Sequence, residues 1–198
     1  MSESGERWRI FCAIEIPRGV SSLATDHITV LRKLFPEVSA SWNRDQNSHL
    51  TLKFIGEIPR AQVGLISQAT ERATASCSPF DFNIGGAGAF PKHGPPKVLW
   101  LGIEDGSGQL GQLHARLEEE CASEGFAREE RAFHPHLTIA RLRKPEGTKK
   151  LAAAHTEMGF APAAIHATEI LVIRSQLSSQ GSKYTTLSRH ELGGEKPN

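Results

Sequence analysis

The spacing of hydrophobic residues predicts a chain in which strands and helices alternate. Residues 9–16 form a short apolar run closed by Pro17, which is typical of a buried strand. Apolar residues then recur at helical spacing, beginning with Leu23 or Ala24, until Pro36 ends the pattern. A strand over 48–58, a helix over 60–76 and a strand over 80–90 follow, so the first half has the order β-α-β-α-β.

The second half of the chain repeats this order. Strands are expected over 97–104 and 136–142, separated by a helix whose inner face carries Leu110, Leu113, Leu117 and Cys121. A helix over about 145–158 and two strands, over 163–175 and 183–192, complete the pattern. Corresponding positions keep a nearly constant offset, which is 97 − 9 = 88 for the first strands and 136 − 49 = 87 for two histidines.

Two copies of so long a unit indicate one pseudo-symmetric domain rather than a solenoid, which needs at least three stacked units. We therefore expect a single α+β domain spanning residues 1–198, with two lobes formed by a first repeat at about 9–90 and a second at about 97–192. The polar tail at the C-terminus is expected to be disordered.

Composition and charge narrow the class of protein. With 198 residues and 38% hydrophobic content the chain can bury a substantial core. Its 23 basic and 22 acidic side chains nearly cancel to +1, so a nucleic-acid partner would have to be held locally rather than by a global positive field. The cysteines Cys12, Cys77 and Cys121 form no CxxC pair, so we expect small buried hydrophobic residues in a reducing compartment.

The polar start of the chain is followed by no apolar run long enough for a signal peptide, and no stretch approaches the ~20 apolar residues of a membrane span. We therefore expect a cytoplasmic protein without a membrane partner. A monomer is expected as well, because no apolar stripe is evident beyond those that the core needs.

The clearest chemical signal is a motif that occurs twice, as HLTLKF at 49–54 and as HLTIAR at 136–141. Successive side chains of a strand point to opposite faces, so the histidine and threonine of each copy share a polar face, whereas the leucines and Phe54 face the core. Two lobes related by a two-fold axis would present four polar side chains to one cleft: His49, Thr51, His136 and Thr138.

Two imidazoles and two hydroxyls in one cleft suit the cleavage of a phosphodiester. An imidazole with an unperturbed pKa of ~6.5 can accept or donate a proton, so a pair supplies both base and acid without a metal. The hydroxyls can donate hydrogen bonds to charged phosphate oxygens, each contributing about 1.5–3 kcal/mol. One such motif is weak evidence, but packing does not require histidine and threonine on the polar face in both halves.

With these motifs, the stretches RIFCAIEIP, SWNRDQNSHLTLKFIGEI, GAGAFPKHGPPKVLWLGIE, FHPHLTIARL and RSQLSSQGSKYTTL make the chain resemble the two-histidine phosphoesterase superfamily. The resemblance is specifically to its RNA 2',3'-cyclic phosphodiesterases, also called 2'-5' RNA ligases. It covers nearly the whole chain. The fold it implies is bilobal, with antiparallel sheets flanking a central cleft and helices outside.

The activity that the resemblance implies is hydrolysis of a 2',3'-cyclic phosphate to a 2'-phosphate, on RNA ends or cyclic nucleotides, with no cofactor and no metal. Reversible 2'-5' ligation of RNA is a second activity of the family. Carried over residue by residue, the resemblance implies that His49, Thr51, His136 and Thr138 are catalytic and that Arg141 binds the phosphate.

Arg141 conflicts with simple alternation, which places it on the same face as Leu137 and Ile139. A strand end or a bulge after Ile139 would bring its side chain to the polar face. Without such an irregularity, Arg141 would be a surface guanidinium or a member of an ion pair.

Two other functions remain open at the level of sequence. His134 lies two residues before His136, and together with His49 these histidines could form a three-histidine zinc site in a hydrolase, although no carboxylate or cysteine ligand accompanies them. The cleft could also belong to a noncatalytic nucleotide- or RNA-binding module. If the protein is a phosphodiesterase or a binding module rather than a zinc hydrolase, we expect His134 to lie at the rim of the cleft.

The basic run over 141–150 directly follows the second motif. A solvated loop is its simplest interpretation, although its position also suits a contact with an RNA tail. Several aromatic residues could stack on a base, but core packing is the commoner fate of such residues: Phe11, Trp42, Trp100, Phe133 and Tyr184.

Overall fold

The computed structural model describes residues 5–44, 48–178 and 181–193. Within them the strands are β1 (Arg7–Glu15), β2 (Ala40–Trp42), β3 (His49–Pro59), β4 (Phe80–Phe90), β5 (Val98–Glu104), β6 (His136–Leu142), β7 (Ala163–Ala167), β8 (Glu169–Ser178) and β9 (Gly181–Glu191). The helices are α1 (Arg18–Leu34), the short 3-10 helix η3 (Arg60–Gln62), α2 (Val63–Thr74), α3 (Gln109–Ser123) and α4 (Thr148–Met158).

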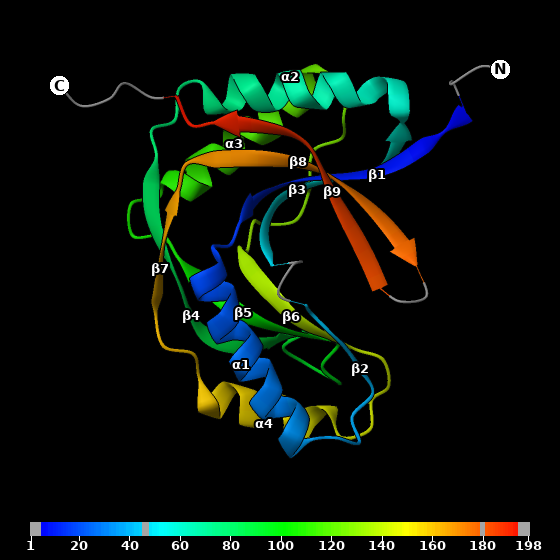
Figure 1. Ribbon diagram of the computed structural model, residues 1–198, viewed down its shortest axis with the longest axis vertical. Helices are drawn as coiled ribbons and strands as arrows, with labels where there is room; N and C mark the ends of the chain where they lie inside the picture. Colours follow the sequence, from blue (N-terminus) through cyan, green and yellow to red (C-terminus); the bar gives the residue numbers. More distant parts are fainter. Residues whose placement is uncertain (1–4, 45–47, 179–180, 194–198) are drawn as a thin grey trace.

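The strands form two antiparallel sheets, each of which combines strands from both halves of the chain (Figure 1). The first sheet has the order β3-β1-β8-β9 and the second β2-β6-β5-β4-β7. Thus β4 pairs with β5 across the middle of the chain, and β8 returns from the second half to pair with β1. This exchange of strands ties the two halves of the sequence together, and it confirms the expected fold of antiparallel sheets with helices.

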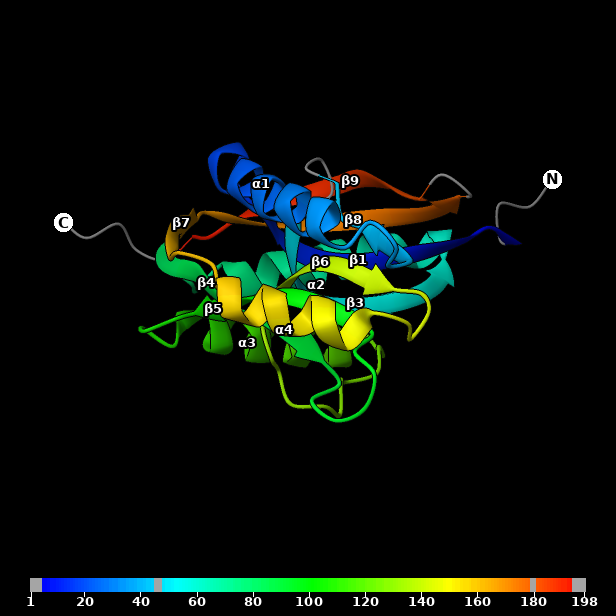
Figure 2. The ribbon, with the colours of Figure 1, turned by 90° about the horizontal axis from the view of Figure 1, so that it is seen from below.

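The helices cover the sheets in two pairs. Helices α2 and α3 pack against each other and against strands of the first sheet, whereas α1 and α4 contact β7 and β4 of the second. Figure 1 shows the first pair at one end of the molecule and the second pair at the other, and Figure 2 shows α1 and α4 running side by side. The helices therefore lie outside, as expected. None of those that the structure describes is long and apolar enough to cross a membrane.

The helical faces that the sequence predicted are buried. In α1 the inward residue is Ala24, which is buried, whereas Leu23 is 51% exposed. In α3 the predicted face is buried in full, and the chain turns just after the helix at Gly125, whose φ of 85° is in the left-handed region that favours glycine. The three cysteines are free and buried, and burial raises the pKa of the Cys12 thiol to about 12.

Three details differ from the sequence-based expectation. The strand predicted over 163–175 is two strands, because the chain leaves the second sheet as β7 and enters the first as β8 after Thr168. The hydrophobic pattern continues across this change of sheet and so gives no sign of it. The short strand β2 was not predicted, and α4 begins only after Gly147. Most of the tail expected to be disordered, residues 194–198, lies outside the described residues.

Candidate active site

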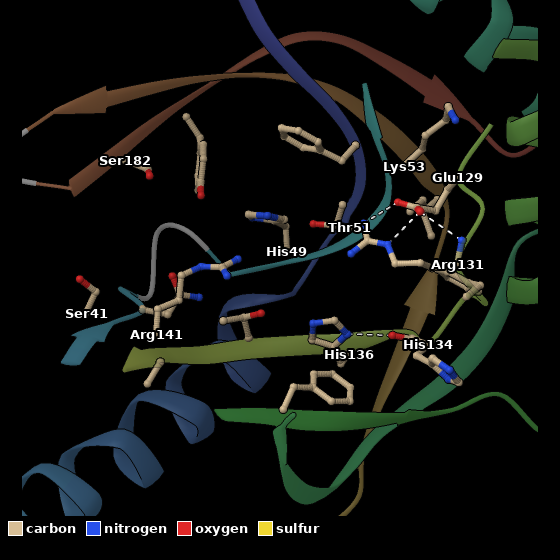
Figure 3. A pocket seen from close by; sticks show the side chains of 18 of the residues that line it. Ser41, His49, Thr51, Lys53, Glu129, Arg131, His134, His136, Arg141 and Ser182 are labelled. Atoms are coloured by element: carbon tan, nitrogen blue, oxygen red, sulfur yellow. Dashed lines mark hydrogen bonds and ion pairs between the residues drawn. The ribbon is translucent and has the colours of Figure 1, made fainter. Parts of the chain in front are cut away.

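The two copies of the repeated motif lie on strands that meet between the sheets. Strand β3 is an edge strand of the first sheet, and it contacts β6 of the second. His49, Thr51, His136 and Thr138 all line one open cleft of about 1170 Å³. Figure 3 shows both histidine rings in this cleft, one from each strand. The structure thus brings together the four side chains that the motif predicted.

Each motif strand contains a bulge directly after its threonine. Opposite β1, Ala13 pairs with Thr51 and Cys12 with Lys53, so that Leu52 has no partner. Opposite β5, Trp100 pairs with Thr138 and Leu99 with Ala140, so that Ile139 has none. The bulges lie at equivalent places, since Thr138 follows Thr51 by 138 − 51 = 87 positions, the offset of the histidines.

Because a bulge adds one residue to a strand, it exchanges the two faces for every residue that follows. Arg141 is therefore exposed and lines the cleft, and of the two irregularities considered for it, a strand end or a bulge, the structure shows the bulge. The same shift makes the expectation for Phe54 wrong. Its side chain is 49% exposed and lines the cleft instead of the core, whereas its neighbour Lys53 is buried.

His49 is surrounded by aromatic rings. Its imidazole lies 4.7 Å from the centre of the Phe11 ring and 5.0 Å from that of Tyr184, which approaches edge-on. Phe11 belongs to a small buried cluster on the cleft side of the first sheet, together with Ala13, Leu171 and Ile173. Packing against this cluster restricts the orientation of the His49 ring.

His136 is oriented by a hydrogen bond. Its Nδ1 donates to the backbone carbonyl oxygen of His134 at 2.8 Å, and its ring meets Phe90 edge-on at 5.3 Å. Phe90 is in turn packed against Trp100. Because a carbonyl oxygen only accepts, neutral His136 carries its proton on Nδ1, and Nε2 is the nitrogen that can take up or deliver a proton in the cleft.

The cleft concentrates positive charge in a protein whose formal net charge is only +1. Its described lining includes one lysine, Lys53, six arginines and two glutamates. Both glutamates are engaged, since Glu118 pairs with Lys53 at 2.6 Å and Glu129 with Arg131 at 2.7 Å. Hydrogen bonds from the side chain of Arg131, together with one from its backbone amide, lower the pKa of the Glu129 carboxyl to about 2. The arginines of the cleft are Arg9, Arg32, Arg44, Arg131, Arg141 and Arg143.

His134 lies at the rim of the cleft, and its ring turns away from His49 (Figure 3). Its carbonyl oxygen, rather than its imidazole, contacts His136. Within the described part of the chain, no group of three or more histidine, cysteine or acidic side chains is arranged to hold a metal ion. The geometry therefore lends no support to a zinc site built from His49, His134 and His136.

Some lining residues were not anticipated. Phe54 would have been found by aligning the two motifs, because it corresponds to Arg141. No sequence pattern marks three further lining residues. Phe90 reaches the cleft from the end of β4, Arg131 from the loop before β6, and Lys53 from the position after the bulge in β3. Of the aromatic candidates for base stacking, three line the cleft, Trp42, Phe133 and Tyr184, whereas Phe11 and Trp100 are not among the residues that line it.

Comparison with known proteins defines the class to which this fold and cleft belong. The family model of the 2'-5' RNA ligase superfamily matches residues 21–178. The RNA 2',3'-cyclic phosphodiesterase of Aeropyrum pernix is 33% identical over 144 residues, which are 72% of this chain and 81% of that protein. The protein of the same name from Thermotoga maritima is 30% identical over 187 residues, 94% of this chain and 96% of that one.

Solved structures agree with this assignment. LigT of E. coli in complex with 3'-AMP has a TM-score of 0.73 and 26% identity, covering 94% of this chain and 99% of that one. TT0787 of Thermus thermophilus has the same fold, with a TM-score of 0.77, 24% identity and coverage of 95% and 100%. The chain belongs to the 2'-5' RNA ligase superfamily, which confirms the resemblance indicated by its paired motifs.

Proposed function

We propose that this protein is a metal-independent RNA 2',3'-cyclic phosphodiesterase that converts cyclic phosphate ends into 2'-phosphates. The observation that carries the proposal is the pair of bulged motif strands, which presents two imidazoles, two hydroxyls and Arg141 to one basic cleft. Relatives with 30% and 33% identity bear the name of this activity.

In the proposed reaction, one of His49 and His136 accepts a proton from a water molecule as the water oxygen attacks phosphorus. The bond between phosphorus and the 3' oxygen breaks, and the other histidine donates a proton to that departing oxygen. A 2'-phosphate and a 3'-hydroxyl result. If a 5'-hydroxyl of a second RNA attacks in place of water, the same proton transfers give a 2'-5' linkage.

The remaining side chains of the site act on the charge of the phosphate. Negative charge increases on the non-bridging oxygens in the transition state, where the hydroxyls of Thr51 and Thr138 can donate hydrogen bonds. The guanidinium of Arg141 can donate two parallel hydrogen bonds to a phosphate. These groups are part of the folded cleft before substrate arrives, so that little reorganisation is needed during the reaction.

The test is to incubate the protein with a 2',3'-cyclic mononucleotide and with a short RNA ending in a cyclic phosphate, each with and without EDTA. We expect a 2'-phosphate product in both conditions. A 3'-phosphate product would contradict the assignment of the leaving oxygen. Loss of turnover with EDTA would indicate a metal enzyme, and absence of turnover on both substrates a noncatalytic binding module.

The assembly and location that we propose are a single two-lobed domain acting as a cytoplasmic monomer on RNA. The buried free thiols suit a reducing compartment. Sedimentation velocity tests the monomer, and the surface to examine if the protein associates is the outer face of α1, where Leu23, Val30 and Leu34 are exposed.

A further inference from the structure

The cleft extends beyond the two histidines in two directions. Towards β2 its lining includes Arg32 at the end of α1, Ser41 and Trp42 on β2, and Arg141 and Arg143 at the end of β6; we call these five residues the basic arm. Figure 3 shows Ser41 and Arg141 on one side of His49, with Lys53 and Glu129 on the other side. Ser41 and Arg141 of the basic arm thus lie across His49 from Glu129 and from Lys53, the partner of Glu118.

The guanidinium groups of the basic arm have no acidic partner among the carboxylates that the structure describes, as none of those carboxylates pairs with Arg32, Arg141 or Arg143. Arg143 is instead held by a neutral group, because its Nε and Nη2 donate to the Ser41 hydroxyl at 3.0 and 2.7 Å. On the opposite side, Lys53 and Arg131 are paired with glutamates. Three of the six arginines that line the cleft therefore lie together in the basic arm without a described carboxylate partner.

Uncompensated guanidinium groups in one part of a cleft repel one another, and a polyanion relieves that repulsion. Arginine matches the geometry of phosphate oxygens better than lysine does, because its planar fork donates two hydrogen bonds at once. A cyclic phosphate bound between the histidines occupies the 2' and 3' oxygens of the terminal ribose. The rest of an RNA chain leaves that ribose through its 5' carbon, and so its next phosphates must lie outside the central site.

We infer that Arg32 and Arg143 of the basic arm bind the phosphates on the 5' side of the cyclic end, next to Arg141 at the cyclic phosphate itself, so that the protein prefers the ends of RNA chains to free cyclic mononucleotides. This inference rests on the proposed function and specifies which substrates that site selects. The contacts are to the backbone, so the preference should depend on chain length and salt but not on sequence.

The experiment compares kcat/KM for a 2',3'-cyclic mononucleotide with that for a tetranucleotide ending in a cyclic phosphate. The wild-type protein should favour the tetranucleotide at low salt. In the double variant Arg32→Gln/Arg143→Gln, the ratio of the two values should fall about tenfold or more, as expected when two charge-assisted hydrogen bonds are lost. The salt dependence of KM for the tetranucleotide should also weaken, by about 0.7 in the log–log slope for each lost phosphate contact.

The matched control removes the same charge elsewhere. Arg72 and Arg189 are partly exposed, lie outside the lining of the cleft and form surface ion pairs, so Arg72→Gln/Arg189→Gln should leave the substrate ratio and the salt slope as in the wild type. A change in both double variants would indicate an effect of net charge alone and would overturn the inference.

The outcomes separate the inference from the function on which it rests. Equal kcat/KM values for the two substrates would overturn the inference that the basic arm binds RNA phosphates, but would leave the proposed phosphodiesterase activity standing. If neither substrate is hydrolysed, the proposed phosphodiesterase activity is wrong. Fluorescence anisotropy with a labelled tetranucleotide then tests separately whether the basic arm binds RNA. Weaker binding to the Arg32→Gln/Arg143→Gln variant than to the wild type would still support the arm, and equal binding would overturn it.

Discussion

The two halves of the catalytic cleft share a geometry but differ in chemistry. β3 and β6 both carry His-Leu-Thr followed by a bulge. After the bulge, β3 continues with the buried Lys53 and the exposed Phe54, whereas β6 continues with the buried Ala140 and the exposed Arg141. The shared part is the part that the proposed proton transfers need, and the difference begins one residue later. At this position one half of the cleft thus has a guanidinium group, and the other has an aromatic ring.

The surroundings of the two histidines also differ in their neighbours. The imidazole of His49 is packed between the rings of Phe11 and Tyr184, and that of His136 meets Phe90 edge-on. The Nδ1 of His136 donates a hydrogen bond to a backbone carbonyl oxygen, which decides which of its nitrogens carries the proton.

The largest expected effect comes from removing either imidazole. His49→Ala and His136→Ala should each lower kcat by about 10² to 10⁴, because each removes one of two partners in proton transfer. The double variant should be barely worse than either single one, since groups that act as a unit lose their effect together. The measurement is kcat on a cyclic mononucleotide, together with its pH profile, which should be bell-shaped in the wild type.

His134→Ala is the control for these variants. Its carbonyl oxygen holds His136, and that oxygen remains after the substitution. The rate and the pH profile should therefore stay close to those of the wild type. If His134→Ala were as damaging as His136→Ala, or if either motif histidine proved dispensable, the paired proton transfer would have to be abandoned.

The next largest effect tests the residue after the first bulge. The Lys53 ammonium and the Glu118 carboxylate form an ion pair at 2.6 Å, with side chains 3% and 8% exposed. Lys53 also donates to the carbonyl of Ala127, and Glu118 accepts from the amide of Glu129. Lys53→Met would leave a buried carboxylate unpaired, which should cost about 3–5 kcal/mol of folding free energy.

For a chain of this length such a loss lowers Tm by roughly 6–20 °C. The double variant Lys53→Met/Glu118→Leu should recover most of it, because it leaves no unpaired charge. At the equivalent position the second half has Ala140, so Ala140→Ser offers a comparison in which no charged pair is broken. A melting curve for Lys53→Met within two degrees of the wild type would show that water or another group compensates the carboxylate.

The sequence predicts most of this fold because local patterns determine it. The faces of α1 and α3, the strand closed by Pro17 and the doubled motif are visible in the spacing of apolar residues. The sequence does not show that β4, from the first half of the chain, joins the second sheet and that β8, from the second half, joins the first. This arrangement depends on which strands pair at long range. For the same reason a single strand was predicted where β7 and β8 belong to different sheets.

Only the site residues that lie within the two motifs could be predicted from the sequence. Alternation placed His49 and Thr51 on one face correctly, and it failed at Phe54 because a bulge has no signature in the hydrophobic pattern. For Arg141 the bulge was expected only because a phosphate-binding arginine required one. Arg131 lies in the loop before β6, and residues in loops are brought to a site by the path of the chain rather than by a periodic pattern.

A smaller effect measures the difference between Arg141 and Phe54 directly. Arg141→Ala should lower kcat/KM by about 10- to 150-fold, the range expected for one charge-assisted hydrogen bond or a bidentate pair. Phe54 lies under the Arg9 guanidinium at 4.5 Å, a contact of about 0.5–1 kcal/mol, so Phe54→Ala should lower kcat/KM about fivefold or less. Equal losses in the two variants would mean that both halves of the cleft bind the phosphate alike.

The threonines test what the two halves share. Thr51→Val and Thr138→Val keep the β-branched shape and remove only the hydroxyl, so each should lower kcat by about tenfold while Tm stays within a degree or two. Because both hydroxyls have the same place relative to the bulge, the two losses should be similar. A variant that keeps its rate but loses several degrees of Tm would assign that hydroxyl to the scaffold instead of the transition state.

The last comparison concerns a difference in the buried polar contacts of the two sheets. Near the first sheet the contact is the charged pair of Lys53 and Glu118, whereas near the second it is a pair of neutral histidines from α1 and α4. His155 Nε2 donates to the carbonyl of Trp100 at 3.0 Å, so its Nδ1 must accept from His27 Nε2 at 2.9 Å. Protonation of His155 at Nδ1 would remove the acceptor of this hydrogen bond.

Burial, with the neighbouring His155, lowers the pKa of His27 to about 4, and burial also lowers that of His155. The folded state therefore binds fewer protons than the unfolded state between about pH 6.5 and 4, so the stabilisation is complete above pH 6.5 and is lost as the pH falls. From His27 alone the loss of unfolding free energy at pH 5 should be about 2 kcal/mol.

Urea unfolding at pH 7.5 and 5 measures this loss. His114 and His190, whose pKa values burial also lowers, add to the total in every variant, so the contribution of His27 is the difference between the wild type and His27→Gln. A proton on His114, which is on α3, faces the Glu118 carboxylate at 3.8 Å, whereas a proton on His27 or His155 faces another imidazole. Acid should therefore loosen the second sheet before the first, and hydrogen exchange at pH 5 should be faster in α4 than in α3. The opposite order would mean that the charged pair, rather than the histidine pair, is the first of the two contacts to fail in acid.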